Sequence, residues 1–135
     1  MSGQVTERAR PLAPFARRSA EVVKRAEHGP YVSLAVSDRE APTPRAGQFY
    51  MLQTAERWGG GADGRPYLPR ALSFSRAEGQ GDQVVLEFLF EDVGPGTRRL
   101  AEAAGGEALL LAGPFGHGFD VGQGRQTLLV RGRNR

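Results

Sequence analysis

The sequence predicts an all-β fold, a six-stranded antiparallel Greek-key barrel with one short helix between strands five and six. Three observations lead to this prediction. Short apolar runs recur along the 135 residues, and turn residues rich in Gly and Pro separate them. Only one segment has both the composition and the end signals of a helix. Helix packing therefore cannot build the core.

The first half of the chain contains three predicted strands. Residues 20–37 hold two apolar runs divided by residues 28–30, His-Gly-Pro, which is turn chemistry. In the second run apolar residues alternate with small or polar ones, the period of a half-buried strand. A Pro-rich connection then leads to a third strand over residues 48–54.

The fourth and fifth predicted strands follow a long polar loop, residues 55–69. Strand four begins at Arg70, in the segment RALSFS, and strand five is QVVLEFLFE, residues 83–91. We expect residues 75–83 to be the turn of a hairpin that makes these two strands antiparallel neighbours.

The predicted helix lies in residues 94–106, with Gly and Thr at its start and Gly105-Gly106 at a left-handed exit. Strand six follows at residues 107–113. We predict that residues 1–18 form a flexible tail and that residues 19–124 form the barrel domain.

The positive charge gathers at the two ends of the chain. Residues 1–25 carry six basic and two acidic side chains, residues 131–135 add three Arg, and the middle is net acidic. A protein that binds phosphate backbones should carry its basic stripe on the folded body, so nucleic-acid binding is disfavoured. Neither a membrane span nor a signal core is evident, and cysteine is absent, so the cytoplasm is the predicted compartment.

The sequence gives no set of catalytic or metal-binding residues. Its two histidines, His28 and His117, lie in Gly-rich turns, and Glu91-Asp92 is the only adjacent pair of carboxylates. Adjacent residues of a strand point to opposite faces, so this pair cannot act together. We predict neither a catalytic residue nor a metal site.

Two features instead suit a phosphate-bearing cofactor. Arg70, at a strand start, offers a planar donor fork that matches a diphosphate. Residues 94–97, Gly-Pro-Gly-Thr, offer free backbone N–H groups and the Thr97 hydroxyl at the helix start. The predicted hairpin brings both to one edge of the barrel, where they would form an anion pocket.

Four blocks, AGQFYML, RALSFS, EFLFEDVGPGTRRL and LAGPFGHGFD, occur in an order and spacing that resemble a known family. Over residues 19–130 the chain resembles the FAD-binding barrel of the ferredoxin-reductase superfamily, most of all the electron-transfer subunit of dihydroorotate dehydrogenase B. The resemblance implies FAD as cofactor. In the family a nicotinamide-binding domain and a cysteine cluster carrying a [2Fe–2S] centre follow the barrel.

The resemblance also implies roles for individual residues. Arg70 would pair with the FAD diphosphate, and Ser73 would approach the N5 edge of the flavin. This chain has Ala71 where the family usually has Pro, and Glu91 where a basic residue is common. The predicted FAD-binding residues are Arg70, Ala71, Leu72, Ser73, Leu89, Phe90, Glu91, Gly96 and Thr97.

By the same resemblance, residues 125–135 are the truncated start of a nicotinamide-binding domain, with Arg131 and Arg133 where the family has glycines. We therefore expect no NADH turnover by this chain alone. Without cysteine, it cannot hold the [2Fe–2S] cluster.

Three functions follow in order. The first is the FAD-binding electron-transfer domain that serves dihydroorotate oxidation in pyrimidine biosynthesis, with the catalytic dihydroorotate dehydrogenase subunit as partner. The second is the flavin domain of another reductase of the ferredoxin or flavodoxin type. The third is a cofactor-free basic barrel that binds nucleic acid or protein.

Overall fold

The structure, a computed structural model, describes residues 16–39, 42–61 and 64–120, with alternate positions from 122 to 130. Most of the predicted tail and the last five residues lie outside this part of the chain. The elements are β1 (Arg18–His28), β2 (Tyr31–Asp38), β3 (Phe49–Thr54), β4 (Arg70–Ser73), β5 (Arg76–Gln80), β6 (Gln83–Glu91), α1 (Pro95–Ala101) and β7 (Ala108–Phe115).

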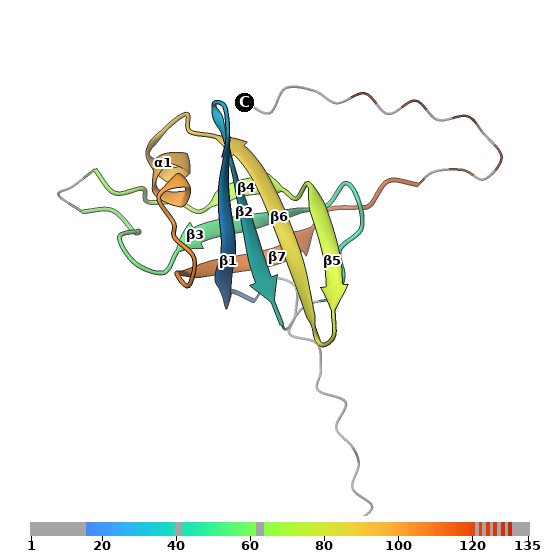
Figure 1. Cartoon of the computed structure of the whole chain (residues 1–135), viewed down its shortest axis with the longest axis horizontal. Helices are drawn as coiled ribbons and strands as arrows, with labels where there is room; N and C mark the ends of the chain where they lie inside the picture. The colour runs from blue at the N-terminus through green and yellow to red at the C-terminus, as the bar shows by residue number, and fades with distance from the viewer. Residues whose placement is uncertain are drawn as a thin grey trace, which may run out of the picture.

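The strands form one antiparallel sheet that curls on itself (Figure 1). Its hydrogen-bonded order is β4-β3-β7-β1-β2-β6-β5, so β4 and β5 lie at its two edges. In the part of the chain that the structure describes, the all-β antiparallel class and the single helix before the last strand are as predicted. The strand count is wrong, because the described residues form seven strands rather than six.

The additional strand is β5, which the sequence had suggested was part of a turn. It pairs with β6, and a two-residue turn at Gly81-Asp82 joins them. Only Ala77 of its five residues is partly buried. An edge strand with so little buried surface has no apolar alternation, so its sequence carries no strand signal.

The predicted hairpin between the fourth and fifth strands is also wrong. β4 pairs with β3, with Arg70 opposite Leu52. The chain then crosses at Ser75, whose N–H and hydroxyl both donate to the carbonyl oxygen of Glu87 in β6, at 2.7 and 3.0 Å. Residues 70–80 thus leave one edge of the sheet and join the other, which brings β4 opposite β6.

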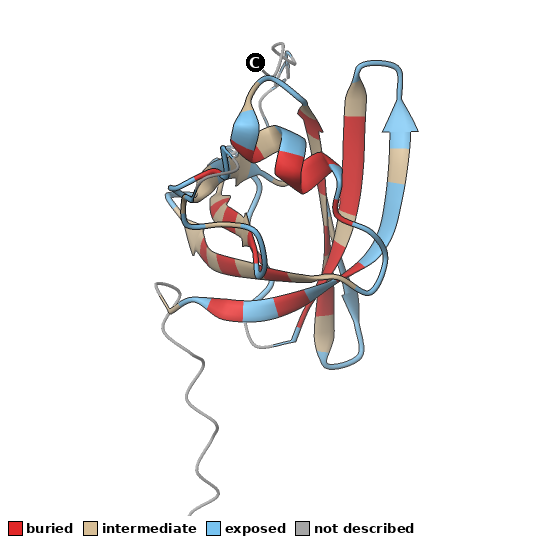
Figure 2. Ribbon diagram, turned by 90° about the vertical axis from the view of Figure 1, so that its left-hand side faces the viewer, coloured by how far each residue is buried: buried red, intermediate tan, exposed pale blue. Residues whose placement is uncertain are grey.

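The core lies inside the curl, where buried and exposed residues alternate along the strands (Figure 2). The predicted alternation in β6 is confirmed, because Val84, Leu86, Phe88 and Phe90 are all buried. Leu100, fully buried, joins α1 to this core.

Helix α1 is shorter than the segment predicted to be helical, residues 94–106. It ends at Ala101, and Gly106, though left-handed at φ 88°, belongs to the turn into β7. The Gly106 N–H donates to the carbonyl of Val22, and the Val22 N–H donates to the carbonyl of Glu107. Pairing with β1 therefore takes over the backbone groups that a longer helix would use.

Candidate functional site

Arg70 is held at the head of β4 by contacts from the preceding loop. Its Nη1 donates to the carbonyl oxygen of Leu68 at 2.6 Å. Its guanidinium carbon lies 6.0 Å from the centre of the Trp58 ring, at the outer limit of a cation–π contact. The sequence did not point to Trp58, although it is the only tryptophan, in a Gly-rich loop.

The Arg70 side chain lies directly against Gly96 at the start of α1. A methyl group on Gly96 would be 2.3 Å from Nε and 2.7 Å from the guanidinium carbon of Arg70. Only a residue without a side chain allows this approach. The structure therefore brings together the guanidinium and the helix start, as predicted, although by a different strand order.

The hydroxyl of Thr97 is occupied by the turn that precedes α1. Thr97 Oγ1 accepts from the N–H groups of Val93 and Gly94 at 2.9 and 3.1 Å, and donates to the Gly94 carbonyl at 3.2 Å. The hydroxyl thus shapes the helix start. The N–H groups of Gly96 and Thr97 are in the first helical turn and have no acceptor within the helix.

A cleft of about 160 Å³ opens between β4 and β6, next to the Arg70–Gly96 contact. Seven of the nine predicted residues line it, and Val93 is an eighth lining residue that the sequence did not suggest. The lining residues are Ala71, Leu72, Ser73, Leu89, Phe90, Glu91, Val93 and Thr97.

The walls of this cleft combine apolar side chains with polar groups at one rim. Leu72 is half-buried and packs against the core, whereas its neighbour Ser73 is exposed. Phe90 is buried at the opposite wall, and Glu91 is half-buried beyond it. The arrangement offers flat apolar contact to a ring and hydrogen-bonding groups to its edge.

Other kinds of site find no support in the part of the chain that the structure describes. It contains no group of three or more His, Asp or Glu residues placed to hold a metal ion. Its one helix is too short to cross a membrane.

Comparisons with known proteins point to one family. The electron transfer subunit of dihydroorotate dehydrogenase B (NAD(+)) from Caldanaerobacter subterraneus is 29% identical over 66% of this chain and 31% of its own length. The subunit of the same name from Clostridium acetobutylicum is 36% identical over 57% of this chain and 27% of its own length. No protein-family model matches.

Solved structures of a ferredoxin reductase have a fold similar to that of this chain. The ferredoxin reductase in carbazole 1,9a-dioxygenase superposes with a TM-score of 0.64 at 26% identity, over 85% of this chain and 33% of the reductase. Its FAD apo form gives a TM-score of 0.59 at 25% identity, over 86% of this chain and 35% of the reductase. The chain thus spans between 27% and 35% of the length of these relatives and structures. In fold and in sequence, the chain is similar to a part of these ferredoxin reductase and electron transfer subunit proteins.

Proposed function

We propose that the chain is the FAD-binding electron-transfer domain of a flavin reductase, serving dihydroorotate oxidation in pyrimidine biosynthesis together with a catalytic dihydroorotate dehydrogenase subunit. The observation that carries this proposal is the cleft between β4 and β6, with Arg70 against Gly96 at its end. The names of the relatives support dihydroorotate dehydrogenase B as the enzyme, and the catalytic partner and the pathway follow from the family resemblance. The cytoplasm remains the predicted compartment.

The residues present fit part of a long cofactor. A cleft of about 160 Å³ is smaller than the roughly 300–1,000 Å³ of pockets that hold a whole ligand. It suits one end of FAD, with the remainder lying along the surface. When bound, FAD supplies the redox chemistry through its flavin ring.

Each residue has a binding or orienting role in this proposal. Arg70 and the first-turn N–H groups at Gly96 and Thr97 bind the diphosphate, because a guanidinium and backbone amides are strong donors to phosphate oxygens. Leu89 and Phe90 pack against the ring system. Ser73, exposed at the rim, orients the flavin at its N5 edge.

The decisive experiment is flavin retention. We expect the purified chain, mixed with FAD and passed through gel filtration, to keep flavin absorbance. Arg70→Ala should weaken FAD binding roughly tenfold or more, the usual effect of losing a charged hydrogen-bonding partner. Arg76→Ala removes the same charge from exposed β5, outside the cleft, and should retain FAD.

A folded chain that holds no flavin at high FAD concentration would reject the proposal. Circular dichroism of the same samples shows whether the barrel is intact. Such a result would favour a cofactor-free barrel instead.

A second candidate is the flavin domain of another ferredoxin-type reductase. The observation behind it is that the ferredoxin reductase in carbazole 1,9a-dioxygenase superposes on 85% of this chain with a TM-score of 0.64. Both candidates require FAD. Complex formation with a catalytic dihydroorotate dehydrogenase subunit, measured by analytical ultracentrifugation, supports the first, and its absence supports the second.

A further inference from the structure

Trp58 is the only tryptophan of the sequence, and its ring lies beside the guanidinium of Arg70. The ring is half-buried and packs against the hydrophobic core, so the core fixes its position. The guanidinium carbon of Arg70 lies 6.0 Å from the ring centre. A fixed aromatic surface thus stands next to a long, flexible side chain and limits where that side chain can go.

The loop that carries Trp58 is closed on itself by backbone hydrogen bonds. The N–H groups of Gly59 and Gly60 both donate to the carbonyl oxygen of Pro66, at 2.8 and 3.1 Å. Gly60 also lies against the ring of Tyr67, since a methyl group on Gly60 would be 3.0 Å from a ring carbon. These contacts tie the start of the loop, next to Trp58, to its end.

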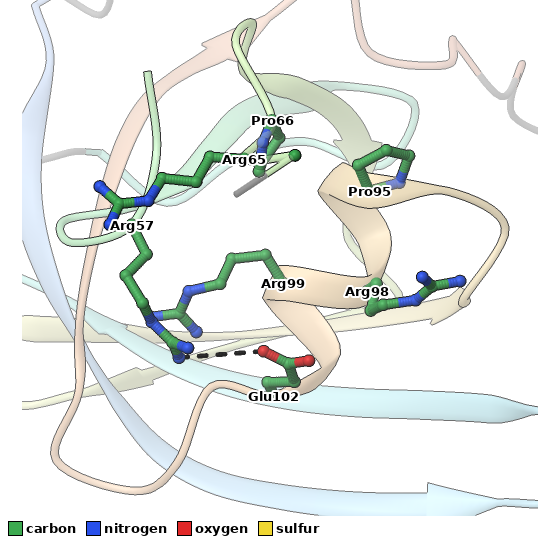
Figure 3. A pocket seen from close by; sticks show the side chains of 8 residues that line it. Arg57, Arg65, Pro66, Pro95, Arg98, Arg99 and Glu102 are labelled. Atoms are coloured by element: carbon green, nitrogen blue, oxygen red, sulfur yellow. Dashed lines mark ion pairs between the residues drawn. The ribbon is translucent and has the colours of Figure 1, made fainter. Parts of the chain in front are cut away.

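The end of the loop makes a second contact with Arg70. Leu68, two residues after Pro66, accepts a hydrogen bond from Arg70 Nη1 at 2.6 Å. Pro66 is buried and, together with Pro95 of α1, lines a pocket of about 440 Å³ between the loop and the helix (Figure 3). The loop therefore lies next to the helix whose Gly96 meets the Arg70 side chain, and loop and helix together confine the guanidinium.

Confinement of Arg70 favours ligand binding, because an arginine side chain loses conformational freedom when it pairs with a ligand. A guanidinium that is already held in place loses less, so the same hydrogen bonds give a higher affinity. No described residue accepts a hydrogen bond from Arg70 Nε or Nη2. These donors therefore remain for phosphate oxygens.

We propose that Trp58 is a positioning residue, whose ring and loop hold the Arg70 guanidinium in place for the diphosphate before the cofactor binds. This inference rests on the proposed FAD function, but the ordering of Arg70 that it requires is a property of the chain without cofactor. The ring is needed and its Nε1 is not, because that atom is buried and has no hydrogen-bond partner among the described residues. Phenylalanine, which keeps a ring and removes the unpaired donor, should therefore replace Trp58.

The first test measures the motion of Arg70 in the chain without FAD, by NMR relaxation of its Nε–H group, assigned with Arg70→Lys. We expect an order parameter above about 0.6 in the unaltered chain and in Trp58→Phe, and below it in Trp58→Leu. Arg76, exposed on β5 and outside the cleft, is the reference in the same spectra and should be mobile in every variant.

An Arg70 Nε–H group as mobile as that of Arg76 in the unaltered chain would overturn the proposal, and this comparison needs no substitution. Equal order of Arg70 in Trp58→Leu and in the unaltered chain would also overturn it. Circular dichroism shows whether Trp58→Leu is folded.

The second test measures FAD affinity by flavin fluorescence titration. Trp58→Leu should weaken binding roughly two- to fivefold, the effect of losing an aromatic ring beside a guanidinium. Trp58→Phe should restore this affinity. In an Arg70→Ala background, Trp58→Leu should have no further effect, because Trp58 acts only through Arg70. Equal weakening with and without Arg70 would contradict the positioning role.

The two tests separate the failure of this inference from the failure of the proposed function. Loss of Arg70 order in Trp58→Leu, in a chain that retains no FAD, would support the positioning role and reject the flavin function. FAD binding that Trp58→Leu leaves unchanged would reject the positioning role, and the flavin function would stand.

Discussion

At the residue scale, Gly96 has no room for a side chain. Arg70 Nε would be 2.3 Å from a methyl group there, and the atoms that must move are the end of a flexible side chain rather than backbone. A substitution at this position would displace the guanidinium and leave the fold intact.

We therefore predict that Gly96→Ala weakens FAD binding roughly tenfold, by displacing the guanidinium that pairs with the diphosphate. Stability should stay equal or rise by up to about 1 kcal/mol, because Ala is the better helix former. Flavin fluorescence titration and thermal unfolding measure the two effects. Gly94→Ala is the control, since a methyl group there meets nothing within 4 Å. Unchanged FAD affinity in Gly96→Ala would contradict the assignment.

At the scale of elements, a buried ion pair joins three strands. Arg18 in β1 donates through Nε and Nη2 to the Asp38 carboxylate in β2, at 2.8 and 2.6 Å. Nη2 also donates to the carbonyl of Gly113 in β7 at 2.9 Å. Both side chains are almost fully buried, so each charged group needs the other as its counter-ion to offset the free-energy cost of burial.

Asp38→Asn should lower the free energy of unfolding by about 3–5 kcal/mol, because it leaves the Arg18 charge buried without its counter-ion. Replacing both residues, as Arg18→Met with Asp38→Leu, should recover much of this loss. Urea unfolding of the single and double variants measures the coupling. Glu27→Gln, which breaks the exposed pair with Arg25, should cost less than about 1 kcal/mol. A similarly small loss in Asp38→Asn would show that the pair does not hold the strands together.

At the scale of the whole molecule, the core makes stability depend on pH through Tyr50. This side chain is fully buried and packs edge-on against Phe74 and Phe88. Burial raises the pKa of the Tyr50 hydroxyl well above its usual value, the Asp38 carboxylate raises it further, and Arg18 opposes both. The fold therefore favours the neutral hydroxyl.

Since an unfolded tyrosine ionises near pH 10, the stabilisation is fully present below that pH and is lost as the pH rises. The free energy of unfolding should fall by about 1.4 kcal/mol per pH unit above pH ~10. Tyr50→Phe should remove this slope, and Tyr67→Phe, at a site 73% exposed, should keep it. Urea unfolding from about pH 8 to 11 tests this. If the free energy of unfolding of Tyr50→Phe falls with pH as steeply as that of the unaltered chain, groups other than Tyr50 cause the pH dependence.

The sequence alone determined the features that depend on local chemistry. Alternation in β6 gave the buried face, turn residues separated the strands, and RALSFS with GPGT indicated the components of the candidate site. These features can be predicted from sequence because hydrophobic periodicity and the backbone preferences of Gly and Pro depend only on a few neighbouring residues.

Only the tertiary structure decided how distant segments meet. The edge strand β5 was missed because it buries almost nothing, and the placement of β4 against β3 depends on pairings across the whole chain. The pocket between α1 and the loop before β4 is absent from any local pattern, since two of its lining residues, Arg57 and Arg99, are 42 positions apart in the sequence and only folding brings them together. Contacts of this kind depend on the order of the sheet, which pattern alone does not determine.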